Sequence, residues 1–86
     1  MLGTTMTTNE LRKGARVHLR NGWQADVADN ARGNIRMCKV YGFETEIGSV
    51  YAHDIMYVEL GDGCLLPIAH TRAQLKLRQS LYAMGM

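Results

Sequence analysis

The sequence predicts a mainly β fold, in which a small antiparallel barrel of five or six strands is followed by a C-terminal α-helix. Short runs of alternating apolar and polar residues recur between residues 16 and 68, with glycine-containing turns between them. Helical spacing of apolar residues appears only after residue 71. An open sheet of this size would leave unprotected edges, so we expect the strands to close into a barrel.

The chain has 86 residues, which is the size of a single domain. We expect residues 1–10 to form a flexible N-terminal segment and residues 11–86 to form one barrel domain that includes the helix. The longest apolar runs are short, so no transmembrane helix is expected. The opening MLGTTMTT lacks the basic and apolar regions of a signal peptide, which predicts a cytoplasmic protein.

The stretch RVHLRNGWQADV, residues 16–27, predicts the first hairpin. With a two-residue loop, the apolar residues of one strand would share a face with the polar residues of the other. A three-residue loop over residues 20–22 pairs Leu19 with Trp23 and puts every apolar side chain on one face. We therefore predict this loop, with Gly22 at positive φ. Trp23 is expected to be buried on the inner face, beside Val17, Leu19 and Val27.

Later strands are predicted at residues 35–43, 47–52, 55–60 and 64–68. The apolar residues of 35–43 do not select one face, so we expect this strand to be covered on both sides. Residues 47–60 form either two strands or one long strand that bends near His53. A tight turn follows at residues 61–63, and Pro67 suits an edge position in the last strand.

A helix is predicted at residues 71–84. Residues 71–74 fit a capping box, and Gly85 stands where a C-terminal stop belongs. Arg72 and Lys76 lie one turn apart on the side away from the apolar stripe, and Arg72 opposes the helix dipole. The stripe that we expect to pack on the barrel consists of Ala73, Leu77, Leu81 and Met84.

The sequence shows no constellation typical of a catalytic or metal site. Cys38 and Cys64 do not form a C-x-x-C pair and are expected to be buried as small hydrophobic residues. The three histidines lack the close spacing that usually anchors a metal. His53 and Asp54 would point to opposite faces of a strand, so they form no dyad unless the backbone turns there. We therefore expect no enzymatic activity, cofactor or metal.

Charge is distributed unevenly along the chain, although the net charge is only +2. Residues 1–40 contain seven Lys and Arg against three acids, and residues 41–71 contain five acids and no Lys or Arg. The C-terminal helix carries three cations and no acid. This pattern predicts a bipolar surface that attracts an acidic partner, unless the charges are merely solvated.

The segment ELRKGARVHLRNGWQADVADNARGNIRMCKV, residues 10–40, resembles the start of a KOW-type or Src-homology-3-like (SH3-like) barrel. A Lys-Gly step leads into a Val-x-Leu strand, a glycine turn follows, and an Ala-x-Val strand returns. Ala25 stands where KOW modules usually have a glycine. Such modules bind nucleic acid or protein. With GFETEIGSVYAHDI and the basic terminal helix, the whole chain is also similar to small accessory proteins of tailed-phage genomes.

Two functions from different classes follow. The first is a protein-interaction module, such as a phage accessory protein in the host cytoplasm that docks on a larger host or viral assembly. It would use an exposed edge or the aromatic residues Tyr41, Phe43, Tyr51 and Tyr57. The alternative is a nucleic-acid-binding barrel that uses the basic outer face of the first two hairpins. We expect no membrane partner, and self-association stays open. The candidate interaction surface comprises Arg16, His18, Arg20, Arg32, Arg36, Lys39, Arg72, Lys76 and Arg78.

Overall fold

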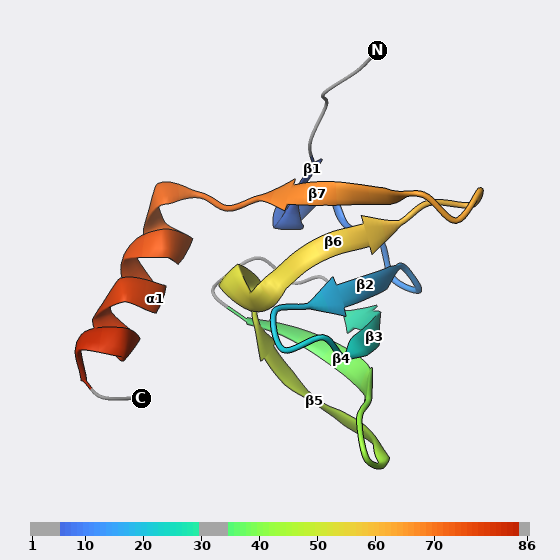
Figure 1. Ribbon diagram of the computed structural model, residues 1–86, viewed down its shortest axis with the longest axis horizontal. Coiled ribbons are helices and arrows are strands. Elements are labelled where there is room, and N and C mark those ends of the chain that lie inside the picture. The colour runs from blue at the N-terminus through green and yellow to red at the C-terminus, as the bar shows by residue number, and fades with distance from the viewer. Residues whose placement is uncertain (1–5, 30–34, 85–86) are drawn as a thin grey trace.

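The computed structural model describes residues 6–29 and 35–84 (Figure 1). These residues form a seven-stranded sheet in the order β1-β7-β6-β2-β3-β4-β5. All neighbouring strands are antiparallel except β1 and β7. The elements are β1 (Met6–Thr7), the 3-10 helix η1 (Thr8–Glu10), β2 (Arg16–Leu19), β3 (Gln24–Asp29), β4 (Ile35–Tyr41), β5 (Thr45–Tyr51), the 3-10 helix η2 (Ala52–Asp54), β6 (Ile55–Glu59), β7 (Leu65–Ala69) and α1 (Arg72–Ala83).

The mainly β fold with one C-terminal helix is confirmed, but the prediction of a closed barrel of five or six strands is wrong. The sheet is open, and β1 and β5 are its two end strands. Figure 1 shows them on opposite sides of the molecule. Closure would require these two strands to pair, and among the described residues they do not; β1 pairs only with β7, through Met6 and Thr7. β1 was not predicted because two residues are too few to show a periodic pattern.

The N-terminal residues 6–10, which were assigned to a flexible segment, instead form β1 and η1. The Thr7 backbone N–H donates to Glu10 Oε1 at 2.9 Å, which closes the first turn of η1. Thr8 is fully buried. Residues 6–10 are therefore part of the domain, whereas residues 1–5 lie outside the described residues.

The first hairpin has the predicted three-residue loop. Leu19 N–H donates to Trp23 O at 2.8 Å, and Gly22 N–H donates to Leu19 O at 2.9 Å. Gly22 has φ +94°, as predicted. The turn between β6 and β7 repeats this geometry, because Gly63 N–H donates to Leu60 O at 2.9 Å and has φ +87°. Both turns thus use glycine at the position of positive φ.

We expect Gly22→Val to lower the free energy of unfolding by more than ~1 kcal/mol, since a β-branched residue is poorly tolerated at positive φ. A Cβ at Gly22 would meet no atom within 4 Å, so the cost comes from the backbone alone. Gly61→Val is the matched control, because Gly61 is equally open and has no positive φ. Denaturant unfolding measures both variants. Equal stabilities would contradict the strained turn.

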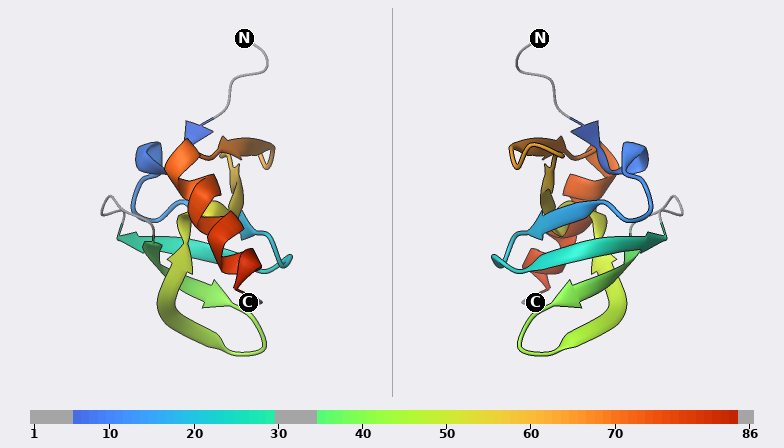
Figure 2. Two further views of the ribbon diagram at one scale, coloured as in Figure 1. Left: turned by 90° about the vertical axis from the view of Figure 1, so that its left-hand side faces the viewer. Right: turned by 90° about the vertical axis from the view of Figure 1, so that its right-hand side faces the viewer.

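The core lies on the inner, concave side of the twisted sheet, and α1 runs across one side of it (Figure 2). Inward side chains alternate with outward ones along β2 and β3, as the first hairpin predicted. The buried cluster consists of Leu11, Val17, Leu19, Ala25, Val27, Cys38, Ile55, Val58 and Ile68.

Trp23 does not belong to this core, so the prediction that it is buried is wrong. Its side chain is 39% exposed and precedes the first residue of β3. The ring packs over Gly42, and its edge contacts Phe43 at a centroid distance of 5.6 Å. The inner face ends at the first hairpin loop, where no described strand continues over Trp23.

Strand β4 is covered on one face only, which contradicts the expected cover on both sides. Arg36 and Cys38 point inward and are buried. Ile35 and Met37 alternate with them and remain exposed on the outer face. The sequence contains apolar residues for both faces, but the described chain supplies cover for the inner face alone.

The helix begins with the predicted capping box. Thr71 N–H donates to Gln74 Oε1 at 3.0 Å, and Gln74 N–H donates to Thr71 Oγ1 at 3.2 Å. Leu77 and Leu81 are half-buried as expected, whereas Ala73 and Met84, the other members of the predicted stripe, are exposed. The most buried helix residue is Gln74, whose Nε2 donates to Thr8 Oγ1 at 2.8 Å. Docking of α1 is thus partly polar. The predicted stop at Gly85 lies outside the described residues.

Candidate functional site

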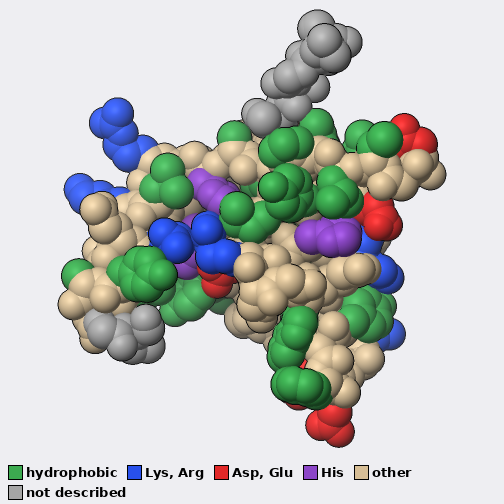
Figure 3. All heavy atoms as spheres, in the orientation of Figure 1, with side chains coloured by type: hydrophobic (Ala, Val, Ile, Leu, Met, Phe, Trp, Pro, Cys, Tyr) green, Lys and Arg blue, Asp and Glu red, His purple; other side chains and the backbone are tan. Residues whose placement is uncertain are grey.

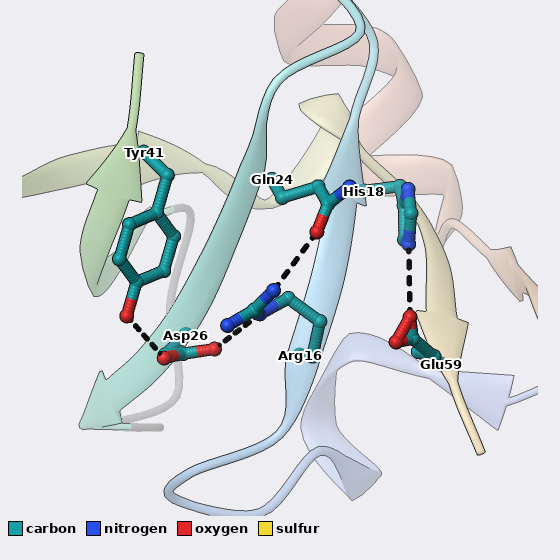
Figure 4. Close-up of polar contacts among 6 residues, drawn as sticks. All are labelled: Arg16, His18, Gln24, Asp26, Tyr41 and Glu59. Carbon is teal, nitrogen blue, oxygen red and sulfur yellow. Dashed lines mark hydrogen bonds and ion pairs between the residues drawn. The ribbon is translucent and has the colours of Figure 1, made fainter. Parts of the chain in front are cut away.

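The outer face of the first hairpin carries paired charges rather than free cations (Figure 4). Arg16 Nε donates to Asp26 Oδ1 at 2.6 Å, and Tyr41 Oη donates to Asp26 Oδ2 at 2.6 Å. A second Arg16 nitrogen donates to Gln24 Oε1 at 2.9 Å. The hydrogen bond from Arg16 lowers the pKa of Asp26, and the hydrogen bond to Asp26 raises the pKa of Tyr41. The charge of Arg16 is therefore compensated within the sheet.

The other two residues that were predicted for the basic face of this hairpin also face acidic groups. His18 Nε2 lies 3.7 Å from Glu59 Oε1 on β6 (Figure 4). Arg20 Nε donates to Asp54 Oδ1 at 3.2 Å, and Arg20 Nη2 donates to the backbone oxygen of His53 at 2.7 Å. The contacts of Arg20 hold the first hairpin loop against η2, and His18 faces β6.

Among the described residues, the next hairpin contributes only Lys39 to the predicted basic outer face. Arg36 is 1% exposed and points inward, where it donates to Asn9 Oδ1 at 2.7 Å and to Ile35 O at 2.8 Å. The prediction that Arg36 lies on an exposed basic surface is therefore wrong. Residues 36 and 39 point to opposite faces of the strand, because side chains alternate along it. Burial lowers the pKa of Arg36. Arg32 lies outside the described residues.

The helix presents the remaining predicted cations. Arg72 and Lys76 are exposed on α1, and the first turn contains no acid. Arg78 is half-buried, with its guanidinium 4.9 Å from the ring centre of Tyr82. Figure 3 shows Lys and Arg side chains gathered over the helix. Arg72 and Lys76 therefore line a separate hollow on α1, whereas Arg78 shares a hollow with Arg20 and Asp54.

His53 and Asp54 lie in η2, where the backbone turns, so their side chains do meet. His53 Nε2 is 3.7 Å from Asp54 Oδ1, and the His53 ring stacks on Tyr51 with centroids 5.0 Å apart. Burial lowers the pKa of His53, because desolvation disfavours the charged ring. Because Arg20 also holds Asp54, the cluster fixes η2 to the first hairpin.

In residues 6–29 and 35–84, no group of three or more His, Cys, Asp or Glu side chains is placed to hold a metal ion. Cys38 is buried as predicted, and burial raises the pKa of its thiol. Cys64 is exposed, so its predicted burial is wrong; it follows the tight turn at residues 61–63, beyond the core. None of the helices in the described ranges is long and apolar enough to cross a membrane.

An apolar groove runs along the inner side of the hairpin formed by β4 and β5. Two adjoining hollows of about 460 and 440 Å³ share Trp23, Val40 and Ser49. Phe43 lies at one end, and its side chain is 98% exposed. We call this surface the inner groove, and its principal apolar walls are Leu19, Trp23, Val40, Phe43 and Tyr51.

Strand β5 forms an open edge beside this groove. Among the described residues, only β4 pairs with β5, over all seven of its residues. On the outer side of the hairpin, Ile47 is 69% exposed and shares a face with Ile35 and Met37. We call these three residues the outer patch. Apolar surface thus flanks the unpaired edge on both sides.

The two ends of β5 differ in charge. Glu44 and Glu46 lie at the turn end and make no ion pair with a described residue. At the other end, Arg78, Tyr51 and the paired Arg20 and Asp54 line a hollow of about 230 Å³. Figure 3 shows acidic side chains at the lower tip of the molecule, and basic side chains on the side of α1.

Sequence reasoning found part of this surface. Of the four aromatic residues expected to dock a partner, Phe43 and Tyr51 line the inner groove. Tyr41 instead donates a hydrogen bond to Asp26, and Tyr57 of β6 lies opposite His18 of β2 in the strand register. The outer patch was missed, although its signal is present in the apolar residues on both faces of residues 35–43. That pattern was interpreted as burial within one chain.

The contact between Trp23 and Gly42 can be tested by Gly42→Ala. A Cβ at Gly42 would lie 2.6 Å from Cε3 and 2.7 Å from Cη2 of Trp23, so the ring has to move outward. We expect the emission of this single tryptophan to shift to the red. We also expect a stability loss of about 1 kcal/mol. Gly61→Ala, which meets no atom within 4 Å, is the control. An unchanged spectrum would contradict the packing of Trp23 on Gly42.

No protein-family model, curated protein or solved structure matches the chain. The open edge of β5, the inner groove and the surrounding charges are therefore the features from which a function can be inferred.

Proposed function

We propose that this protein is a small non-catalytic protein-interaction module that docks through the unpaired edge of β5. The observation that carries the proposal is a seven-residue edge strand flanked by apolar surface on both sides. An exposed strand edge offers backbone hydrogen-bonding groups to an added strand, and neighbouring apolar surfaces accept its side chains. The proposed role agrees with the expectation, drawn from the sequence alone, of a phage accessory protein that docks on a larger host or viral assembly.

The opposite edge of the sheet supports the choice of β5. There, β1 covers Ile68 and Ala69 of β7. Pro67 stands in the uncovered part of that strand and cannot donate a backbone hydrogen bond. β5 contains neither proline nor a Lys or Arg residue that would discourage an added strand.

Nucleic-acid binding, the alternative, has weaker support. Arg16, His18 and Arg20 face Asp26, Glu59 and Asp54, respectively, and Arg36 is buried. A phosphate backbone would have to displace these acids or rely on the few other cations. The exposed pair Arg72 and Lys76 on α1 is the best remaining contact for an anion.

A library of displayed random peptides tests the proposal, with wild-type protein and two variants immobilised at low density. Ile47→Lys places a charge on the open edge, and Leu65→Lys is the matched control on β7, where an exposed leucine is replaced. We expect extended peptides with alternating apolar residues to bind wild type and Leu65→Lys. Ile47→Lys should bind them at least about tenfold more weakly, the equivalent of 1.4 kcal/mol.

Two results would overturn the proposal. Selection of no peptide, or of peptides that bind all three proteins equally, would remove the docking role of β5. A gel shift of a single-stranded oligonucleotide with a steep salt dependence, lost on combining Arg72→Gln with Lys76→Gln, would favour the alternative.

A further inference from the structure

We infer that the partner of β5 is a second copy of this chain, paired antiparallel across a two-fold axis at Gly48. The inference rests on the proposed docking role of β5 and names its occupant. The pairing would join two seven-stranded sheets edge to edge. Such an interface is isologous, because the same strand contributes from both copies.

Charge favours the antiparallel orientation. Glu44 and Glu46 lie at one end of β5, and Arg78 lies near the other end together with the paired Arg20 and Asp54, so Arg78 is the cation there that makes no ion pair with a described residue. Antiparallel pairing brings the acidic end of each copy to the basic end of the other. Parallel pairing would instead place the four glutamates of two copies together, which is unfavourable. The strand is therefore electrostatically complementary to itself in one orientation only.

The length of the strand sets the position of the axis. β5 spans Thr45–Tyr51, so pairing of all seven residues with their counterparts places Gly48 on the axis. Ile47 of one copy then faces Ser49 of the other, and Glu46 faces Val50 of the other. No glutamate lies directly opposite another glutamate in this register.

Self-pairing also accounts for the apolar surface that the single chain leaves exposed. Ile47 lies beside the axis on the outer face, directly opposite Lys39 of β4 and diagonal to Met37, while Ile35 lies further along the same face, opposite Tyr51. Two outer patches would become continuous across the joined edge. β4 would then be part of an apolar surface shared by two copies, which explains why the apolar residues of its sequence occupy both faces.

Sedimentation equilibrium over a range of protein concentrations tests the inference. We expect wild type and Leu65→Lys to pass from monomer to dimer as concentration rises. Because both copies contribute residue 47 to the interface, Ile47→Lys places two lysines there and should weaken the dimer more than about tenfold. Because Ile47 is largely exposed, the fold of this variant should be unchanged, and circular dichroism checks this. A monomeric wild type at every concentration, or an equally dimeric Ile47→Lys, would overturn the inference.

Crosslinking tests the register in a Cys64→Ser background, which removes the exposed thiol. A mixture of Ile47→Cys and Ser49→Cys chains should form a disulfide-linked dimer with oxidised glutathione, because directly paired Cα atoms lie within disulfide range. Each variant alone should crosslink far less, since identical residues are displaced by two positions along the strand. Equal crosslinking of the mixture and of either variant alone would contradict the axis at Gly48.

The two proposals fail separately. If the protein is monomeric and selected peptides bind β5, self-pairing is wrong and the interaction module stands. If the protein is monomeric and no peptide binds, both are wrong. Peptides that bind β5 and also dissociate the dimer would support both.

Discussion

Truncation of Ile55 to Ala should lower the free energy of unfolding by about 2–5 kcal/mol, because the substitution removes buried methyl groups and leaves a cavity. Ile55 has no exposed surface and lies where β6 pairs with β2, opposite Leu19. A domain of this size has a total stability of roughly 5–15 kcal/mol, so the variant would lose a large part of it. Urea unfolding followed by circular dichroism measures the change.

Ile47→Ala is the matched control for Ile55→Ala, since the same side chain is removed from an exposed position on a strand. Measured at a protein concentration low enough to avoid self-association, it should change stability by less than about 0.5 kcal/mol. Similar losses in the two variants would mean that the inner face of the sheet has been misassigned.

Truncation of Arg36 to Ala should cost about 2–4 kcal/mol, although arginine is usually a surface residue. Its side chain fills space beneath η1 and donates to Asn9 Oδ1 at 2.7 Å and to Thr8 Oγ1 at 3.5 Å. Removal would leave a cavity and withdraw donors from partly or fully buried acceptors. Thermal and urea unfolding should both show the loss.

Lys39→Ala provides the comparison for Arg36→Ala, because Lys39 lies on the same strand with its side chain on the outer face. Its removal should change stability within about 0.5 kcal/mol. A loss at position 36 no larger than at position 39 would show that the buried arginine contributes no more than a surface cation.

Local features of the fold could be predicted because they depend on neighbouring residues. The parity of apolar residues around residues 20–22 determines which hairpin loop keeps one face apolar, and Gly22 supplies the positive φ. The capping box at Thr71 and Gln74 likewise spans only one turn. The hairpin loop and the helix cap are each determined by residues that are close in the sequence, so the sequence pattern alone was sufficient to predict them.

Features that depend on distant residues could not be predicted. Trp23 has the right parity for the core, but its burial depends on whether another strand covers that end of the sheet. The prediction of a closed barrel failed for the same reason, since the pairing of β1 with β7 depends on residues that are far apart in the sequence.

The candidate site was only partly visible in the sequence. Phe43 and Tyr51 could be named as exposed aromatic residues, whereas the acids that compensate Arg16 and Arg20 lie on other segments and were found only in the structure. Arg36 is different, because the alternation of side chains along a strand already predicts that Arg36 and Lys39 point to opposite faces. The apolar residues on both faces of β4 were also visible, but a single sequence does not reveal whether the same chain or another one covers them.

The pairing of β1 with β7 has a consequence for the order of folding. Met6 pairs with Ile68, and the hydrogen bond from Gln74 to Thr8 joins residues 66 positions apart. Contacts of such long sequence separation close large loops and form slowly. During synthesis on the ribosome, residues 6–8 emerge before β7 and α1, so they have to wait for these elements before they can pack against them. Residues 6–8 are therefore among the last of this domain to pack, although they are made before most of it.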